Sequence, residues 1–395
     1  MYKIAIITPY GAEERLDHYA EFILAKGLVA HGEHVQFYTY AIQNNPDYRN
    51  GLYQGVNVRR CWQKAGIAPG LFFSILRFRP DFVCYFHPRS FLSFTAYVAG
   101  RCVGAKIISE IVGILHDPFI VGDPDNPLET IKAHPLLIRT WRDFFTEFFL
   151  LRWSLLWTNL LMHLPIAKAD VIVAINRDEA NYIHTWYGRS STLIYWSIPQ
   201  SEKHGENDQP SFYHDLPNEY LLFLGQIKKR KGWDTVIEAL ALLKDQGIIK
   251  KLVFVSPSKD LTLAREYAKK YGVENHIVFL SSITNQEKKW LYDHAQSVLA
   301  PSRYEGFGLP VFEGFVAGKP VLATKIPVYE EFLVHGKNAL LSESGNARAL
   351  ADSIISLDKD PVLGATLVAE GYRTAAEFSD TIMISKFVQL FASMK

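Results

Sequence analysis

The first half of the chain alternates short apolar runs with stretches whose apolar positions recur at helical spacing. The runs at 3–11, 81–87 and 105–113 predict buried strands that end in turns. After the first run, one face of an expected helix collects Leu16, Tyr19, Ala20, Ile23 and Gly27. This order predicts a sheet covered by helices, with ligands at the carboxyl ends of the strands.

The second half repeats this pattern more regularly. Its apolar runs predict strands at 220–224, 252–257, 277–280, 297–300 and 319–324. A helix after the first of these runs is expected to bury Val236, Ile237, Leu240 and Leu243, and another is expected at 285–295. Because each strand follows a helix, the pattern predicts an α/β fold with a parallel, doubly wound sheet.

A polar stretch separates the two halves. Residues 199–218 are rich in turn formers and predict a linker. We therefore expect an N-terminal Rossmann-like domain at 1–200 and a C-terminal one at 201–375. The tail at 376–395 predicts a helix from the spacing of its apolar residues, which are Ile382, Ile384, Phe387, Leu390 and Phe391.

Composition argues against several classes of function. The 395 residues include 42 Lys and Arg against 41 Asp and Glu, a net charge of +1, so no electrostatic field for nucleic acid is expected. Cys61, Cys84 and Cys102 lack metal-ligand spacing and lie in or near apolar runs, which predicts reduced core thiols. Because the first strand follows Met1 directly, we expect no signal peptide and a cytoplasmic location.

The segment at 301–313 carries the most specific chemistry. It places Glu305 and Glu313 on either side of a glycine turn that precedes a helix, and Pro310 fits the first position of that helix. Backbone amides at a helix N-terminus favour a diphosphate, and we expect Glu305 to accept hydrogen bonds from sugar hydroxyls and Glu313 from both ribose hydroxyls. The amides expected at this turn belong to Gly306, Phe307, Gly308 and Leu309.

A second glycine turn follows the predicted strand at 220–224. Its four consecutive cations, at 228–231, suit the negative charge of a diphosphate, although a solvated basic loop is an alternative interpretation. The residues of this turn that are candidates for binding the diphosphate of a sugar nucleotide are Gly225, Gln226, Lys228, Arg230 and Lys231.

Together the two segments resemble the Glu-x7-Glu signature and the basic turn of retaining GT-B-type glycosyltransferases of the large family-four class. The resemblance implies two facing Rossmann-like domains with an active-site cleft between them, and a final helix at 376–395 that packs back on the first domain. It implies Lys231 and Glu305 as catalytic residues acting on a nucleoside-diphosphate-sugar. No metal and no other cofactor is expected, because amides and cations hold the diphosphate.

Some positions depart from the family pattern. Gln226 stands where relatives commonly have an arginine, so either Arg230 or Lys228 supplies that charge or phosphate binding is weaker than in the family. Gly11 is the glycine available at the first turn for a contact to the donor phosphate.

The histidine that relatives often place near the anomeric carbon has two candidates here. His116 is the one we assign to the reaction centre, and His87 is the second, because Val112 can occupy the family's own histidine position. A loop histidine without a catalytic role is the alternative for both.

Residues 133–165 lie outside the family pattern. The expected helix bears aromatic residues on one face, Trp141, Phe144, Phe145 and Phe148, and charged residues on the other, Arg139, Arg142, Asp143 and Glu147. Interspersed charges leave no uncharged run of the roughly 18 residues that a transmembrane helix needs. Such a face is typical of a helix in a membrane interface, and a buried helical pair or a dimer interface are the alternatives.

The sequence therefore predicts a retaining, metal-independent hexosyltransferase that acts on an acceptor hydroxyl, with a lipid-linked or polysaccharide-precursor acceptor suggested by 133–165. This would place the enzyme in polysaccharide or glycolipid biosynthesis, peripheral on the inner membrane face. An inactive nucleotide-sugar-binding partner of the same fold stays open as an alternative, motivated by Gln226 and the replaced histidine. A nucleotide-sugar epimerase or a phosphorylase of this architecture is a third interpretation.

Overall fold

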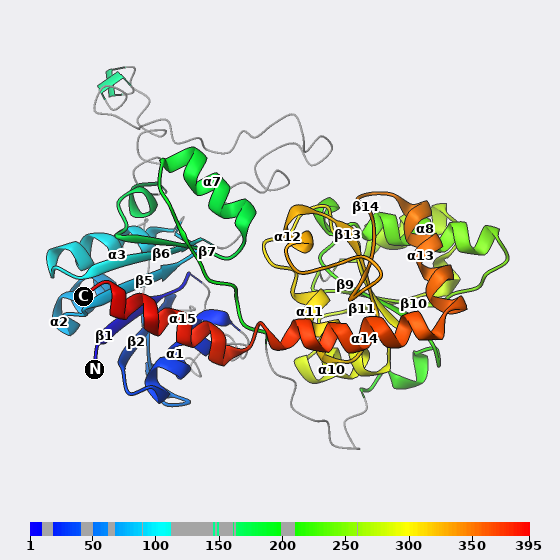
Figure 1. Cartoon of the computed structure of the whole chain (residues 1–395), viewed down its shortest axis with the longest axis horizontal. Coiled ribbons are helices and arrows are strands. Elements are labelled where there is room, and N and C mark those ends of the chain that lie inside the picture. The colour runs from blue at the N-terminus through cyan, green and yellow to red at the C-terminus, as the bar shows by residue number, and fades with distance from the viewer. Residues whose placement is uncertain are drawn as a thin grey trace. The chain divides into compact units, whose positions relative to one another are not determined.

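The computed structural model describes residues 1–9, 19–40, 50–61, 68–88, 90–111, 145–146, 148–149, 161, 163–198, 210–258 and 260–395. The chain divides into two compact units (Figure 1). Unit 1 comprises Met1–Ser197 and Asp380–Lys395, and unit 2 comprises Ile198–Ser379. The division falls a few residues away from the limits at 200 and 376 that composition indicated.

Unit 1 contains a sheet with the strand order β3-β4-β2-β1-β5-β6-β7-β8. Neighbouring strands are parallel except β3 and β4, which are antiparallel. The strands are β1 (Lys3–Ile7), β2 (His34–Tyr40), β3 (Gly51–Tyr53), β4 (Val56–Cys61), β5 (Phe82–Phe86), β6 (Lys106–Ile111), β7 (Val171–Ala174) and β8 (Thr192–Leu193). The strand order reverses between β1 and β5.

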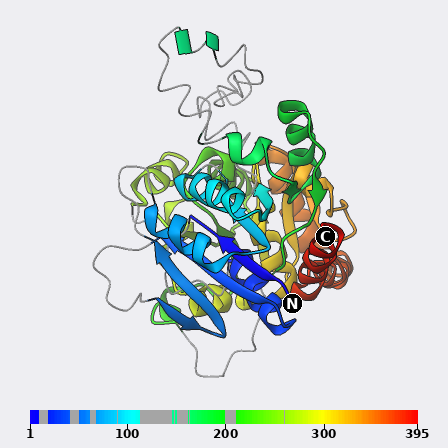
Figure 2. The ribbon, with the colours of Figure 1, turned by 90° about the vertical axis from the view of Figure 1, so that its left-hand side faces the viewer.

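Helices cover both faces of this sheet (Figure 2). Alternate residues of β1 point to opposite sides, so Ile4 and Ile6 pack with α1 and α15, whereas Ala5 and Ile7 pack with α2, α3 and α7. Both ends of the chain belong to unit 1, since α15 packs against α1. The helices are α1 (Ala20–Ala30), α2 (Pro69–Phe78), α3 (Phe91–Cys102), α7 (Arg177–Tyr187) and α15 (Asp380–Ser393).

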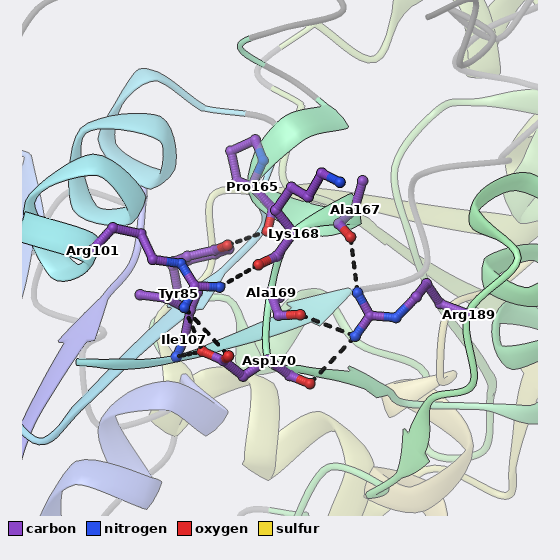
Figure 3. Close-up of polar contacts among 9 residues, drawn as sticks. All are labelled: Tyr85, Arg101, Ile107, Pro165, Ala167, Lys168, Ala169, Asp170 and Arg189. Atoms are coloured by element: carbon purple, nitrogen blue, oxygen red, sulfur yellow. Dashed lines mark hydrogen bonds and ion pairs between the residues drawn. The ribbon is translucent and has the colours of Figure 1, made fainter. Parts of the chain in front are cut away.

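Two arginines fix the chain where it re-enters this sheet ahead of β7 (Figure 3). Arg101 of α3 donates to the carboxylate of Asp170 at 3.0 and 3.3 Å and to the carbonyl oxygen of Lys168 at 2.5 Å. Asp170 also accepts from the backbone amide of Ile107 in β6 at 2.7 Å. Arg189 donates to the carbonyl oxygens of Ala167, Ala169 and Asp170. The network lies at the amino end of β7, away from the edge where ligands are expected, so its role is to join β6 to β7.

Unit 2 contains a fully parallel sheet with the strand order β11-β10-β9-β12-β13-β14. Counted within the unit, this is the order 3-2-1-4-5-6 of a doubly wound dinucleotide-binding sheet. The strands are β9 (Leu221–Leu224), β10 (Leu252–Ser256), β11 (Ile277–Ser281), β12 (Ser297–Ala300), β13 (Val321–Lys325) and β14 (Leu340–Glu343). The parallel, doubly wound sheet predicted for this half is therefore confirmed.

The helices of unit 2 also cover both faces. One face of the sheet, with Leu221 and Phe223, packs against α8, α9 and α13, and the other, with Val298 and Val321, lies under α11. The helices are α8 (Trp233–Asp245), α9 (Thr262–Lys270), α10 (Asn285–His294), α11 (Leu309–Val316), α12 (Pro327–Glu330), α13 (Ala347–Lys359) and α14 (Pro361–Ala376), with 3-10 turns η2 (Tyr213–Asp215), η3 (Lys229–Lys231) and η4 (Glu274–His276).

One prediction about the core is wrong. Cys61 and Cys84 are buried, as expected, but Cys102 is exposed. Cys102 is the last residue of α3, and its side chain lies on the exposed side of that helix end. Among the described helices, none combines the length and the apolar content that crossing a bilayer requires.

Candidate functional site

The topological switch point of unit 2 lies between β9 and β12, the two central strands at which the strand order reverses. Open α/β sheets bind ligands outside the carboxyl ends of the strands at such a point, because the connections on either side leave in opposite directions. The chain that follows β9 is the basic turn at 225–232, and the chain that follows β12 is the segment at 301–308. The fold thus brings together the two segments that the sequence analysis selected independently.

A close backbone approach joins the two segments. Gly232, which ends η3, has a φ of +66°, and a Cβ atom there would lie 1.9 Å from the carbonyl oxygen of Pro301. Only glycine fits a left-handed position at that separation. As a result, the side chains of Arg230 and Lys231 are held beside Glu305.

Glu305 is the centre of a buried ionic cluster. Its side chain is 6% exposed, and its Oε1 lies 2.5 Å from Lys231 Nζ, while its Oε2 lies 3.7 Å from Arg230 Nη1. Ser302 Oγ donates a further hydrogen bond to Glu305 Oε1 at 2.7 Å. A buried carboxylate is tolerated when it is paired and hydrogen-bonded in this way. Two cations around one carboxylate also leave positive charge available for an anion.

The turn before α11 has the expected helix-opening geometry. Gly308 is the N-cap with a φ of +92°, and Pro310 lies in the first turn. A Cβ atom on Gly308 would lie 2.3 Å from Tyr329 Cε1, so this position also requires glycine. Phe307 is buried and stacks on Phe312 with ring centroids 4.7 Å apart, so only its backbone can face a ligand.

Tyr329 lines the Glu305 side of this turn. Its side chain is fully buried, and desolvation raises the pKa of Tyr329 well above its usual value, with the charge of Glu305 acting in the same direction. The phenol is therefore a neutral wall of the site and does not supply a base.

Glu313 lies in α11 and has a different ionic partner from Glu305. Lys288 of α10 donates to Glu313 Oε1 at 2.6 Å. Tyr292 is buried next to it: burial and then Glu313 raise the pKa of Tyr292 well above its usual value. Glu313 thus has its own cation partner, Lys288, which is separate from the cations around Glu305.

The remaining predicted residues of the basic turn differ in their surroundings. Lys228 is exposed, whereas Arg230 approaches Glu305. Of the two cations that could replace the arginine missing at position 226, Arg230 is therefore the one that lies at the Glu305 cluster. Gly225 lies directly after β9, where a Cβ atom would be 2.9 Å from Phe223 Cζ. The Oε1 atom of Gln226 is buried and accepts no hydrogen bond within the described residues.

Two predicted site residues, Gly11 and His116, lie outside the described residues. The second histidine candidate, His87, follows β5 at the switch point of unit 1 and has a φ of +54°. Its Nε2 lies 3.3 Å from Glu21 Oε1, which also accepts from Thr8 Oγ1 at 3.3 Å. His87 is therefore fixed against a buried carboxylate of α1 at the ligand edge of its own sheet.

Unit 1 also contains a buried carboxylate that the sequence analysis did not select. Glu110 of β6 is 2% exposed and accepts from Trp196 Nε1 at 2.6 Å. Desolvation raises the pKa of Glu110 well above its usual value. The hydrogen bond from Trp196 lowers this pKa in part, and the charges of Glu21 and Glu179 raise it further. Glu110 stands second to last in an apolar strand. Its position in the sequence could therefore have predicted its burial, but not which side chains surround it.

Three further residues at the site of unit 2 were also missed. Ser302 and Arg303 stand within the selected segment, and Lys288 stands on a helix distant in sequence. Their contacts depend on which strands are neighbours, and no spacing in the sequence reports that.

Residues 206–374 match the family described as Glycosyl transferases group 1. This match covers the whole of the candidate site in unit 2, including both selected segments. Most of unit 2 is therefore similar to the glycosyl transferases group 1 family.

Two curated relatives and one solved structure illustrate the wider likeness. The D-inositol 3-phosphate glycosyltransferase of Rhodococcus erythropolis is 27% identical over 227 residues, which cover 54% of this chain and 51% of that protein. That of Corynebacterium aurimucosum is 31% identical over 218 residues, which cover 50% of each. The chain thus spans about half the length of these relatives.

The crystal structure of Anabaena HepE in complex with UDP and glucose has a TM-score of 0.72 and 17% sequence identity, and the match covers 100% of both chains. At that identity the likeness shows the fold alone. It confirms the predicted α/β fold class with two Rossmann-like, parallel-sheet domains of the GT-B type.

Proposed function

We propose that this protein is a glycosyltransferase that moves a sugar from a nucleoside-diphosphate-sugar to an acceptor hydroxyl. The observation that carries the proposal is the cluster of Lys231, Arg230 and Glu305 at the topological switch point of unit 2. The match of 206–374 to the glycosyl transferases group 1 family and the sugar transfer named for the relatives support it.

Each group of the cluster has a role in this reaction. Lys231 and Arg230 neutralise the negative charge that grows on the leaving diphosphate, which stabilises the transition state electrostatically. Backbone amides at 306–309 approach the phosphate or the edge of the sugar, helped by the left-handed turn at Gly308. Glu305 accepts from donor-sugar hydroxyls, and Glu313 accepts from the ribose.

The reaction is proposed to retain the anomeric configuration and to need no metal. Double displacement requires two carboxylates about 5 Å apart across the sugar. Glu305 and Glu313 instead have separate cation partners, Lys231 and Lys288, and are given separate ligands here. Attack on the same face as the departing phosphate, without a protein nucleophile, fits this division, and the two cations of the cluster do the work of a metal.

Binding of the donor tests the proposal first. Thermal unfolding should be measured with UDP, GDP, ADP and dTDP and with their sugars, because a ligand that binds the folded state raises its apparent stability. The nucleoside diphosphate with one of the four bases, and its sugars, should raise the unfolding midpoint in a concentration-dependent way. UDP-glucose is the first sugar to try, since the structurally similar HepE was crystallised with UDP and glucose. The absence of a shift with all four series would overturn the proposal.

Turnover then tests the chemistry. The purified protein should slowly hydrolyse the nucleotide sugar that binds, and proton NMR of the released or transferred sugar should show the anomer of the donor. Excess EDTA should leave the rate unchanged. An inverted first product would refute retention, and a rate that collapses in EDTA and returns with Mg²⁺ would refute metal independence.

The second candidate function is a nucleotide-sugar-binding partner that does not catalyse transfer. Gln226 favours it, because glutamine supplies no charge where relatives commonly have an arginine. Binding without any hydrolysis or transfer over long incubation would support this candidate. A measurable turnover that disappears in Lys231→Ala would exclude it.

A lipid-linked acceptor is proposed from the aromatic region around 145–149. Phe145 and Phe149 are 51% and 77% exposed and stack on each other with centroids 6.4 Å apart. Exposed phenylalanines on a helix suit insertion into the interface of a membrane. The protein should co-sediment with anionic liposomes, and Phe145→Glu with Phe148→Glu should abolish this. Equal sedimentation of both proteins would reject the proposal.

A further inference from the structure

We propose that Arg303 is a positioning residue that sets Arg230 and Lys231 in place for the donor diphosphate. The inference rests on the proposed function, which gives no role to Arg303. Arg303 follows Ser302 in the loop after β12, yet its side chain does not pair with Glu305 two residues away. It extends instead to the basic turn after β9.

The guanidinium group of Arg303 holds both ends of that turn. Its Nη1 donates to the carbonyl oxygen of Lys229 at 2.7 Å, inside η3. Its two terminal nitrogens bind both carboxylate oxygens of Asp234, Nη1 to Oδ1 at 2.6 Å and Nη2 to Oδ2 at 2.9 Å, and Nη2 donates to Thr235 Oγ1 at 3.1 Å. Asp234 and Thr235 lie in the first turn of α8, so one side chain connects η3 to the helix that follows it.

The backbone of Arg303 also binds the basic turn. We call its side-chain and backbone contacts to Lys229, Arg230 and Asp234 the Arg303 clamp. The amide of Arg303 donates to the carbonyl oxygen of Arg230 at 2.7 Å, and the amide of Tyr304 donates to it at 3.3 Å. The neighbouring contact of Gly232 with Pro301 leaves no space for the turn to move toward the loop. The carbonyls of Lys229 and Arg230 are thus both bound by Arg303, immediately before the two cations that face Glu305.

This arrangement explains why an arginine is needed. Bidentate binding of Asp234 uses the planar fork of the guanidinium group, and the same group still has a hydrogen for the Lys229 carbonyl. A lysine is a point charge and cannot make both contacts. Without the clamp, η3 is held by fewer bonds, and the cations are no longer fixed relative to the α11 turn. A displacement of about 1 Å at a charge-stabilising group can cost about 100-fold in rate.

The experiment compares Arg303→Ala, Arg303→Lys and Asp234→Asn with the wild-type protein. The measurements are kcat and KM with the nucleotide sugar that the wild type uses, UDP binding by calorimetry, and the thermal unfolding midpoint. We expect kcat to fall about 100-fold in Arg303→Ala, with smaller falls in Arg303→Lys and Asp234→Asn, while KM changes by less than kcat. Arg373→Ala is the matched control, because Arg373 is 75% exposed and pairs with Glu370 in the same unit. It should behave as the wild type.

A double-mutant cycle separates positioning from general stability. If Arg303 acts through Arg230 and Lys231, Arg303→Lys should have a smaller effect on kcat in a Lys231→Ala background than in the wild type, and little further effect when Arg230→Ala is added. If Arg303 only stabilises the fold, the two losses will be additive and will follow the unfolding midpoint, which overturns the proposal. Should Arg303→Ala fail to fold, Arg303→Lys and Asp234→Asn decide the question by the same cycle.

Donor binding by the wild type and the kcat of the Arg303 variants test different claims. A wild-type protein that binds none of the four nucleoside diphosphates overturns the proposed function and this inference with it. A wild-type protein that binds and turns over, with Arg303→Lys and Asp234→Asn equal to it in kcat, overturns the positioning role alone.

Discussion

Each unit places a buried glutamate near the carboxyl end of a parallel strand system, but the two glutamates have opposite surroundings. In unit 2, Glu305 contacts Lys231 and Arg230 and accepts from Ser302. In unit 1, Glu110 accepts from the neutral indole of Trp196 and has other carboxylates as its charged neighbours. The surroundings of the buried glutamate are thus cationic in unit 2, beside the strand β12, and acidic in unit 1, on the strand β6.

The difference shows how two sheets of one architecture can prefer different ligands. Excess positive charge at the switch point of unit 2 attracts an anion such as a diphosphate. Desolvation keeps Glu110 protonated well above the usual pH range of a carboxyl group, so unit 1 presents a neutral hydrogen-bonding group at its edge. Under the proposed function, these surroundings suit the phosphates of the donor in unit 2 and uncharged hydroxyls in unit 1.

Removing Lys231 is expected to have the largest effect on the difference between the surroundings of Glu305 and those of Glu110. Lys231→Ala leaves Glu305 buried with a single, more distant cation, which makes its surroundings resemble those of Glu110. We expect turnover to fall by about 10²–10³-fold, and Glu305→Ala to have an effect of the same order. The measurement is kcat with the donor that binds.

Lys325→Ala is the control for this change. Lys325 pairs with Glu343 at 2.8 Å on the surface of the same unit and lies outside the cluster. Its removal should leave kcat unchanged. Mild and equal losses in Lys231→Ala, Glu305→Ala and Glu313→Ala would contradict the separate roles assigned to these residues.

A smaller effect is expected from Glu313, which has its own cation in Lys288 and belongs to a different part of the donor site. Glu313→Ala should raise KM for the donor about tenfold, equivalent to about 1.4 kcal/mol, because one charged hydrogen bond to the ribose is lost. kcat should change little. Steady-state kinetics on the donor measures both, with Glu343→Ala as the surface control. A fall in kcat without a change in KM would indicate that Glu313 acts at the reaction centre and not in binding the ribose.

The smallest effect concerns unit 1 and is one of pH. Because the folded protein binds the Glu110 proton more tightly than the unfolded chain, the stabilisation is complete below the ordinary pKa of 4.5 and is lost as pH rises through the folded-state pKa. Glu110→Gln keeps an acceptor for Trp196 and has no charge. We expect this variant to be more stable than the wild type at about pH 8, by on the order of 1 kcal/mol, and to lose that advantage near pH 5.

Chemical unfolding at the two pH values, followed by circular dichroism, measures this difference. Glu266→Gln, at an exposed position of α9, is the control and should show no pH-dependent gain. An equal stability difference between Glu110→Gln and the wild type at both pH values would show that Glu110 has an ordinary pKa.

Much of the fold could be predicted from the apolar runs and helical spacings. The strands at 221–224, 252–256 and 297–300 and the helix α10 lie where the pattern predicted them. The predicted burial of Val236, Ile237, Leu240 and Leu243 on α8 is confirmed. The error at Cys102 arose because an apolar neighbourhood in sequence does not specify which side of a helix faces the sheet.

The candidate site could be predicted in part. Glycine spacing and the order of strand, turn and helix selected Glu305 and the α11 turn, because these are properties of one continuous segment. The choice between Arg230 and Lys228 needed the structure, since η3 turns one cation toward Glu305 and leaves the other in solvent. The phenyl ring of Phe307 turned out to be a core group, which the motif does not reveal.

By itself the sequence determined where the strands and helices begin, which turns demand glycine, and which short segments carry charge, because each of these follows from interactions between near neighbours in the chain. The tertiary structure alone decided that β9 lies beside β12, and hence that Arg303 binds Asp234 and that Lys231 binds Glu305 across 74 residues of sequence. The physical reason is that strand order is fixed by packing of the whole sheet, so the partners of a charged side chain are set by elements far away in the chain.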